Sequence, residues 1–469
     1  MSAIITNTFR RQSCQRFLND IIDVNNNYYI GLGKSDPWSD DENANPVPLP
    51  NGSVLESQDV QDNLISLVRL KTQATLFPKN RWRSGRTYKV YDPTDPLLFD
   101  LQSDITTYYP SVMTHNDRVY ACLSNVSNGA STTPPSGTTY GIEVTADGYV
   151  WTYIQDVDID SAFYSDEFVP VATTPESDTG QLNATGGALY NFAVLNGGFG
   201  LDGSEKLMLS CIDSNGVEIV NSNLNTDARF AVTRSSGSIT DISYVDIASD
   251  LIKGVHKASV IVYNSTQDTI LDYVVIKPMV AKAAGFGSNP TEELPSYYAG
   301  CFSKFQGPVD GEALTGVPFR QVSLIKNPAS VDNGDDDVFY EDDEALDATK
   351  YVQIVQDGVT QNFLSGAIIE QAGTGARAIV DKTDMDNDRI YYHRNSDNNV
   401  NYIAFNNSDD ITITSLDGEV TQVFPDSDIS SILVSEYTHN TGEVVFIDNR
   451  AKITRNADQT EDVKIVIQF

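Results

Sequence analysis

Short runs rich in apolar residues, typical of β-strands, fill most of this chain, and turn dipeptides separate them. The runs that we predict as strands lie at residues 28–32, 118–123, 149–154, 206–210, 258–263, 272–276 and 463–469. Between them stand pairs such as Asn215-Gly216 and Asp417-Gly418, which favour tight turns. The pattern predicts a mainly β (α+β) fold, with layered β-sandwich domains and a small α/β element.

Helical periodicity is confined to two segments near the start of the chain. Residues 9–22 place apolar side chains at helical spacing, namely Phe9, Phe17, Leu18, Ile21 and Ile22. Residues 58–71 do the same, and Asp59 and Asp62 fall in the expected first turn, where acids interact favourably with the helix dipole. We therefore expect two short N-terminal helices.

Shifts in composition predict three parts. Residues 1–172 form the N-terminal part of a main body, and residues 317–469 form its C-terminal part, with a small β insert at about 345–428. Residues 173–316 are predicted as an inserted β-rich module, because a polar linker precedes strands with NGG-type turns. At 469 residues the chain is long enough to bury more than one core.

Charge and composition argue against several classes of partner. The 65 acidic residues exceed the 31 basic ones, giving a net charge of -34, and repulsion from phosphates argues against nucleic acid. Apolar runs are too short for a membrane span, so we expect no membrane insertion. The four cysteines and four histidines are each isolated in the sequence. This spacing argues against a metal site or a disulfide framework and fits folding in a reducing cytoplasm.

The Gly33-Lys34-Ser35 segment resembles the end of a phosphate-binding loop. Tyr28 stands where the first glycine of that loop should be, and Asp36-Pro37 blocks the helix whose N-terminus would face the phosphate. We therefore predict a buried strand that runs into a proline turn, and no nucleotide site.

Two further motifs have structural explanations. Residues 198–203 satisfy GxGxxG, but a strand pattern follows where a helix is required, so we expect a hairpin turn. Residues 156–167 match much of a calcium loop, yet Ser161 occupies the glycine position and the preceding residues are β-like. We expect no cofactor and no metal, and we assign no catalytic residue.

The turn after residues 28–32 is the candidate interface. Pro37 and Trp38 precede an acidic run that contains Asp40, Asp41 and Glu42. A tryptophan beside proline and charge is the kind of residue that anchors a protein interface. The alternative is that Trp38 packs locally.

Four segments carry a resemblance to a known family. They are residues 28–43 (YYIGLGKSDPWSDDEN), 119–154, 317–329 (VPFRQVSLIKNPA) and 442–469. In this order, and preceded by the helix at 9–22, they resemble the baseplate wedge subunit that occurs as a dimer in T-even-like contractile-tailed bacteriophages. Residues 172–316 and 335–428, which these segments do not cover, read as two extra inserts.

The resemblance implies a structural role without catalysis. Such a protein holds neighbouring wedge proteins and supports assembly of the six-wedge baseplate around the tail hub. The resemblance also implies a homodimer, other baseplate wedge proteins as partners, and no small-molecule substrate. The expected location is the virion tail baseplate, after assembly in the host cytoplasm.

The alternative function is a tail-associated glycan-binding or glycan-cleaving protein. Glycosidases need two carboxylates at a defined separation, and an acid-rich sequence offers such pairs by chance. Fibre proteins also carry their receptor-binding modules at the C-terminus, whereas residues 463–469 read as a strand buried in its own domain. We therefore favour the structural role.

Overall fold

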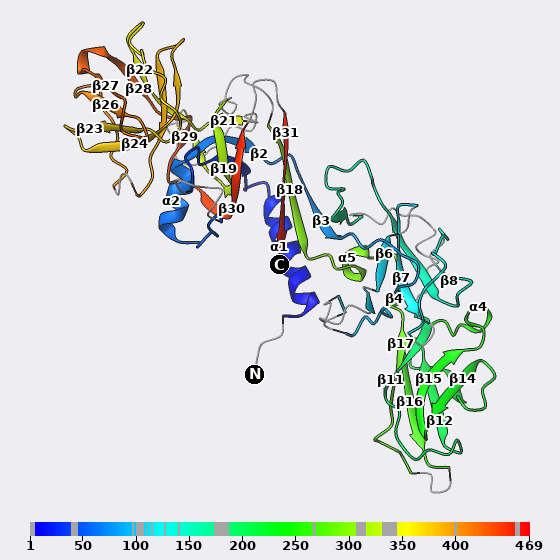
Figure 1. The fold of residues 1–469 in the computed structure, drawn as a ribbon. Helices are drawn as coiled ribbons and strands as arrows, with labels where there is room; N and C mark the ends of the chain where they lie inside the picture. Colours follow the sequence, from blue (N-terminus) through cyan, green and yellow to red (C-terminus); the bar gives the residue numbers. More distant parts are fainter. Residues whose placement is uncertain are drawn as a thin grey trace. The chain divides into compact units, whose positions relative to one another are not determined.

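The computed structural model describes residues 5–38, 46–95, 98–99, 107–108, 110–113, 116–125, 128–138, 141–172, 187–265, 269–305, 316–330, 345–397, 401–454 and 460–469. One compact unit comprises Met1–Leu18, Ala74–Gly300 and Val466–Phe469, and the other comprises Asn19–Gln73 and Cys301–Ile465. Along the chain, the division falls within α1 (Asn7–Ile21), β3 (Thr72–Pro78), β18 (Tyr298–Phe305) and β31 (Glu461–Gln468). The chain is mostly β with several antiparallel sheets, which confirms the predicted fold class (Figure 1).

A four-stranded antiparallel sheet forms the first core of the first unit. Its order is β6-β7-β9-β8, with bounds β6 (Ser111–Met113), β7 (Arg118–Ser124), β8 (Ile142–Val144) and β9 (Val150–Asp156). Two shorter pairs are β3 with β10 (Phe168–Pro170) and β4 (Thr87–Tyr88) with β5 (Thr107–Tyr108). Strands β7 and β9 confirm the strands predicted at residues 118–123 and 149–154. Trp151 is fully buried and stacks on Tyr149, with ring centroids 5.5 Å apart.

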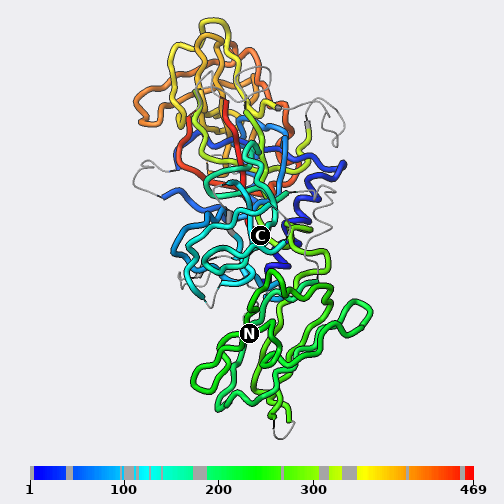
Figure 2. Tube along the Cα trace, turned by 90° about the vertical axis from the view of Figure 1, so that its right-hand side faces the viewer, coloured from blue at the N-terminus to red at the C-terminus, as the bar shows by residue number. Residues whose placement is uncertain are grey.

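Residues 187–281 form a second group of strands with a core of their own. The group contains the sheet β13-β12-β16 and the pairs β11–β17 and β14–β15. Figures 1 and 2 show it in green as a distinct cluster of strands. Leu207, Leu209 and Ile242 are wholly buried in its core, whereas Tyr190 and Met279 pack into the core that also contains residues of β7 and β9. The bounds are β11 (Leu189–Asn196), β12 (Lys206–Ile212), β13 (Glu218–Asn223), β14 (Phe230–Ser235), β15 (Ser238–Tyr244), α4 (Ile247–Asp250), β16 (Lys257–Tyr263) and β17 (Val275–Val280), and α5 (Pro290–Glu293) follows.

The GxGxxG segment joins strands of two different sheets. Strand β11 pairs with β17, and β12 pairs with β13 and β16, so the expected hairpin turn at residues 198–203 is wrong. A strand follows, as predicted. Gly198, Gly200 and Gly203 have positive φ angles of 74°, 65° and 92°, a region that side chains disfavour. The glycines therefore serve the path of the backbone between sheets.

Strand β1 (Tyr28–Gly33) lies at the centre of a five-stranded sheet in the second unit, in the order β21-β2-β1-β19-β30. Its neighbours are β2 (Leu64–Arg69) and β19 (Pro318–Lys326), and the outer strands are β21 (Ala345–Asp347) and β30 (Glu443–Thr454). All six residues of β1 are buried, as the sequence predicts. Gly31 permits the close approach of the neighbouring strands, because a Cβ there would lie 2.6 Å from the side chains of Leu64 and Ser323.

The prediction of a helix over residues 58–71 is right for residues 58–62 and wrong beyond them. Helix α2 spans Val54–Asp62, and residues 64–69 form β2. Ser53 caps the helix, since its hydroxyl accepts a hydrogen bond from the Glu56 N–H at 3.1 Å. Strand β2 is buried along nearly its whole length, on both faces of the strand. Its mainly apolar sequence is therefore compatible with the period of a helix as well as with that of a strand. Asp59 and Asp62 therefore lie towards the C-terminal end of α2, opposite to the expected end.

A seven-stranded antiparallel sheet spans residues 350–433, here named the seven-stranded module. Its order is β27-β26-β23-β24-β25-β22-β28, and its core includes the fully buried Val352, Val380 and Ile413. Its bounds are β22 (Lys350–Ile354), β23 (Ile368–Gln371), β24 (Ala376–Asp384), β25 (Arg389–His393), β26 (Ile411–Thr414), β27 (Thr421–Phe424), η1 (Asp426–Asp428) and β28 (Ile429–Leu433). Strand β20 (Ala329–Ser330) pairs separately with β29 (Tyr437–Thr438).

The elements at the two ends of the chain were both predicted from the sequence. Helix α1 confirms the first predicted helix, and Leu18 faces the core while Phe9 is 59% exposed. Within β31, Ile465 is the buried residue, so the strand is less buried than expected.

All four cysteines are buried free thiols. Within the described ranges, no helix is both long and apolar enough to cross a membrane.

Candidate functional site

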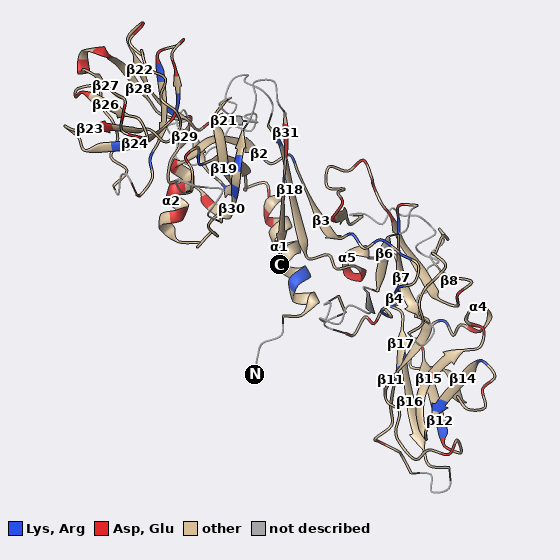
Figure 3. Cartoon of the chain, viewed as in Figure 1, with Lys and Arg blue, Asp and Glu red and all other residues tan. Residues whose placement is uncertain are grey.

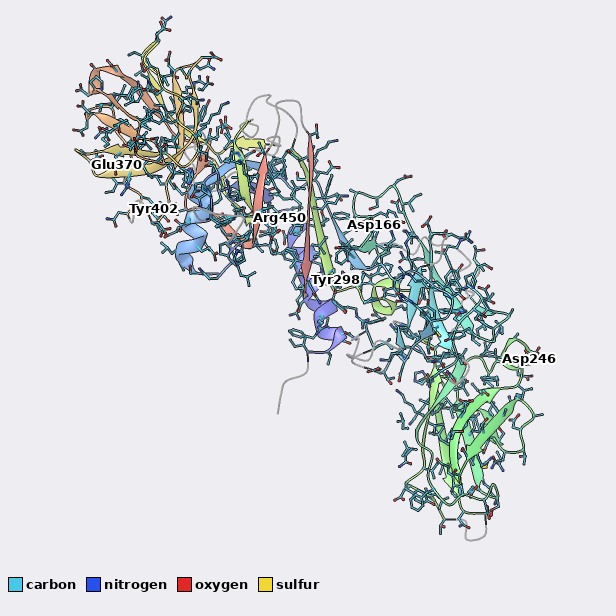
Figure 4. All side chains as sticks on the ribbon, in the orientation of Figure 1. Asp166, Asp246, Tyr298, Glu370, Tyr402 and Arg450 are labelled. Atoms are coloured by element: carbon cyan, nitrogen blue, oxygen red, sulfur yellow. The ribbon has the colours of Figure 1, made fainter. Side chains whose placement is uncertain are left out.

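The turn after β1 is packed against its own unit. The indole N–H of Trp38 donates a 2.8 Å hydrogen bond to the carbonyl of Arg450, and the Lys34 ammonium lies 5.2 Å from the centre of the indole ring. Trp38 is half-buried. Arg450 is labelled on β30 in Figure 4. The local-packing alternative therefore accounts for these contacts of Trp38, and its role as an interface residue stays a prediction.

Of the other candidate interface residues, Pro37 is the one that the structure describes. Pro37 lies against Gly366 of the seven-stranded module, where a Cβ would be 3.9 Å from its Cδ. Asp40, Asp41 and Glu42 lie outside the described residues.

Asp36 and Asp381 clamp one histidine between them. Nδ1 of His393 lies 2.6 Å from an oxygen of Asp381, and its Nε2 lies 3.0 Å from an oxygen of Asp36. The three side chains are almost fully buried. Ser35 donates to Asp381 as well, and Arg320 donates to the carbonyl of Ser35. The turn after β1 is thus tied to β24 and to the end of β25.

The charge states in this clamp follow from burial and pairing. Burial alone would lower the pKa of His393, but attraction and hydrogen bonding by Asp381 and Asp36 raise it to about 9. Burial raises the pKa of Asp36, and the opposing hydrogen bond and charge of His393, with Lys34, bring it well below its usual value. At neutral pH the clamp therefore holds an imidazolium between two acids.

Asp62, the last residue of α2, joins a second buried cluster. Its carboxylate lies 3.3 Å from the Lys350 ammonium and 3.0 Å from the Arg394 guanidinium. It also accepts the backbone N–H of Arg394 at 2.8 Å. Both Asp62 and Lys350 are 3% exposed in their side chains. Because two cations face one carboxylate, this end of α2 is fixed on the module despite the unfavourable helix dipole.

Pairing also decides the charge states in the second cluster. Burial raises the pKa of Asp62, but attraction by Lys350 and Arg394, with a hydrogen bond from Arg394, brings it down to about 2. His439 is buried beside Lys350, and burial together with that charge lowers its pKa to about 3. His439 is therefore neutral at physiological pH, and its Nδ1 lies 3.1 Å from the carbonyl of Gln61.

Asp59 provides the third acidic contact from this part of the chain. Its carboxylate accepts the backbone N–H of Ser396 at 2.6 Å and the hydroxyl of Tyr402 at 2.7 Å. Figure 3 shows the acids on α2, and Figure 4 labels Tyr402 near this helix. Asp36, Asp59 and Asp62 thus contact residues of β22 and β25 or residues that follow β25 in the chain. We name Asp36, Asp59, Asp62, Lys350, His393 and Arg394 the charge lock.

Sequence reasoning missed the charge lock. The sequence pattern assigned Asp36 to a proline turn that blocks a phosphate-binding helix, Asp59 and Asp62 to a helix start, and the histidines to isolated positions. A signal was present in the adjacent cations His393 and Arg394, at the end of a β pattern in an acidic chain. Its partners could not be read from the sequence, because they lie more than three hundred residues away.

The calcium-like segment is held by ordinary contacts. Asp156 forms an ion pair with Arg118 at 3.4 Å, and Asp158 accepts the N–H of Asp160. In the ranges that the structure describes, no group of three or more His, Cys, Asp or Glu side chains is placed to hold a metal ion.

Four members of the charge lock, Asp36, Asp62, Lys350 and His393, are buried, and the contacts of the charge lock hold α2 and the turn after β1 on the seven-stranded module. The three acids of the charge lock lie in the stretch of the chain that a known family covers. Residues 3–123 match Phage-Gp8, the family of bacteriophage T4 Gp8. The Gp8 match takes in α1, β1, α2 and β2, together with the first of the four segments that carry the resemblance. A search of curated proteins found no match. The Gp8 match supports a T4-like baseplate wedge subunit.

Proposed function

We propose that this protein is a structural subunit of a phage tail baseplate wedge, where it holds neighbouring wedge proteins and supports assembly of the six-wedge baseplate. The Gp8 match over residues 3–123 carries the proposal. The charge lock agrees with it, because it fixes the seven-stranded module to the five-stranded sheet and so suits a part whose work is geometric. No catalytic step is required of such a subunit.

The subunit acts as a homodimer in this proposal, as the resemblance implies. A twofold interface brings the same patch of each protomer together, so like charges must be kept out of its centre. Light scattering of the purified protein at physiological salt is expected to give twice the mass of one chain. A strict monomer at micromolar concentration would remove the dimer from the proposal and leave the wedge role to be tested separately.

The acidic run after Trp38 is the proposed contact with other wedge proteins. Replacing Asp40, Asp41 and Glu42 by Asn, Asn and Gln is expected to weaken co-assembly with baseplate subunits of the same phage, about two- to tenfold, as for exposed charge pairs. The control variant neutralises three exposed acids elsewhere, Glu218, Asp272 and Glu419. Sedimentation of the mixed subunits measures complex formation. Equal behaviour of the two variants would move the docking surface away from this run.

A reducing-end assay on host-surface polysaccharide separates the two function classes. We expect no sugar release from the purified protein or from the complex. Sugar release without complex formation would overturn the structural role and favour the glycan-cleaving alternative.

A further inference from the structure

Five Asn-Gly pairs occur in this chain, and each is a place where an asparagine can react with its own main chain. The backbone nitrogen of the glycine attacks the carboxamide carbon of the asparagine, and a glycine has no side chain to hinder the approach. Asn333-Gly334 lies outside the described residues, and the four described pairs begin at Asn51, Asn128, Asn196 and Asn215. The contacts around each pair decide which asparagine reacts.

The pair Asn51-Gly52 has a base on one side and a donor on the other. A carboxylate oxygen of Glu56 accepts the backbone N–H of Gly52 at 2.6 Å, which is the reach that general-base catalysis needs. The backbone N–H of Ser53 donates at 2.8 Å to the side-chain oxygen of Asn51. Negative charge develops on that oxygen when the carboxamide carbon is attacked, and a donor already in place stabilises it. The turn therefore activates both reacting groups.

The same pair is open to solvent and lies outside helices and strands. Asn51 and Gly52 are exposed, and Glu56 is half-buried. A Cβ placed on Gly52 would have no atom within 4 Å, so the space beside the reacting nitrogen is open. Water can reach the turn, and closure of a ring between the two residues meets no packed neighbour.

The other described pairs lack this arrangement. The N–H groups of Gly129 and Gly216 donate to backbone carbonyls at 3.0 and 3.1 Å. A carbonyl oxygen holds the hydrogen but is too weak a base to remove it. Gly197 packs against the main chain of Ile239, where a Cβ would lie 1.9 Å from the carbonyl oxygen. These pairs therefore serve as comparisons within the same molecule.

We infer that Asn51 deamidates by a reaction within its own turn, in which Glu56 is the base. Glu56 accepts the proton of the Gly52 N–H while the Gly52 nitrogen bonds to the carboxamide carbon of Asn51. The bond from that carbon to the side-chain nitrogen then breaks, and the proton leaves with it as ammonia. Water opens the resulting five-membered imide at either carbonyl and leaves aspartate or isoaspartate at position 51.

The products change the start of α2. Each places a new negative charge beside Glu56, and like charges at short distance repel. Isoaspartate also lengthens the main chain by one methylene, which displaces the two N–H groups that Glu56 accepts at 2.8 and 2.6 Å. We expect faster hydrogen exchange in the first turn of α2 after the reaction. This modification does not depend on the proposed function.

Mass spectrometry of the aged full chain tests the inference. The purified protein is incubated at physiological temperature and digested, and fragment ions locate each conversion of amide to acid. We expect Asn51 to react at least about fivefold faster than Asn215 in the same molecules. Because Glu56 takes the proton in place of hydroxide, we expect the Asn51 rate to change little between about pH 6 and 8, whereas the Asn215 rate rises with pH.

Variants assign the base. Glu56→Gln keeps the size of the side chain and a hydrogen-bond acceptor but cannot take the proton, so the Asn51 reaction should slow about fivefold or more. The Asn215 rate in that variant should stay as it is. Glu419→Gln removes an exposed acid far along the chain and should leave both rates unchanged. Hydrogen exchange of the α2 amides before ageing shows whether each variant keeps the helix.

Two results would overturn the inference. One is an Asn51 that reacts no faster than Asn215 in the unaltered protein. The other is an unchanged or faster Asn51 reaction in Glu56→Gln with α2 intact, which would remove Glu56 as the base.

Discussion

Replacing Asp62 by alanine is expected to lower the free energy of unfolding of the second unit by about 3–5 kcal/mol, the range for breaking a buried ion pair from one side. The change leaves Lys350, 3% exposed, and Arg394 without their common carboxylate. Urea denaturation measures the loss, and hydrogen exchange of the β22 amides assigns it to this unit. The control is Glu419→Ala, an exposed acid, for which a change within about 0.5 kcal/mol is expected.

A double-mutant cycle between Asp62 and Lys350 shows whether the loss comes from the pair. Because the two side chains share one buried site, we expect a coupling free energy of about 0.5–3 kcal/mol. A single-variant loss below about 1 kcal/mol, together with additive effects in the cycle, would mean that the charge lock does not hold α2 to the module.

Stability of the second unit is expected to fall as the pH rises from 6.5 to about 9, because of His393. Below pH 6.5 the imidazole is protonated in the folded and the unfolded protein alike, so its full contribution is present. Between these pH values the folded protein keeps a proton that the unfolded chain has lost. The total loss is about 3 kcal/mol at 1.36 kcal/mol per pKa unit, and it is complete above the folded pKa.

His393→Gln tests this pH dependence. Glutamine cannot carry the charge that Asp36 and Asp381 face, so the variant should be less stable at pH 6 and should lose the decline between pH 6.5 and 9. Hydrogen exchange of the β24 and β25 amides across this range is the measurement. His256→Gln is the control, since His256 is exposed, and it should retain the decline. A decline of equal size in the His393 variant would assign the effect to other groups.

The sequence predicted the parts of the fold in which one period dominates. Strands β1, β7, β9 and β12 follow from alternation or from a short apolar run between turns, and α1 follows from helical spacing. The prediction failed at residues 64–69. A strand that is buried on both faces lacks the regular alternation of apolar and polar residues by which a strand is told from a helix. It failed again at residues 198–203, because turn residues do not reveal which strands pair across them.

The candidate site was less predictable than the fold. Trp38 and Pro37 attract attention as residue types, and the structure gives both of them contacts within their own unit. The charge lock depends on strands that meet only in three dimensions. A single sequence gives the charges of Asp62 and Arg394 but not their partnership, which is a consequence of the sheet order.

The long separation within the charge lock has a consequence for synthesis of the protein. Asp62 and Arg394 are 332 residues apart, and Asp59 and Ser396 are 337 apart. The acids leave the ribosome long before their partners in the second half of the chain, and closing so large a loop is slow. A chain that terminates before β25 lacks His393 for Asp36, Ser396 for Asp59 and Arg394 for Asp62. The contacts that Asp59 and Asp62 make with residues 394–396 therefore form only after residue 396 has been translated.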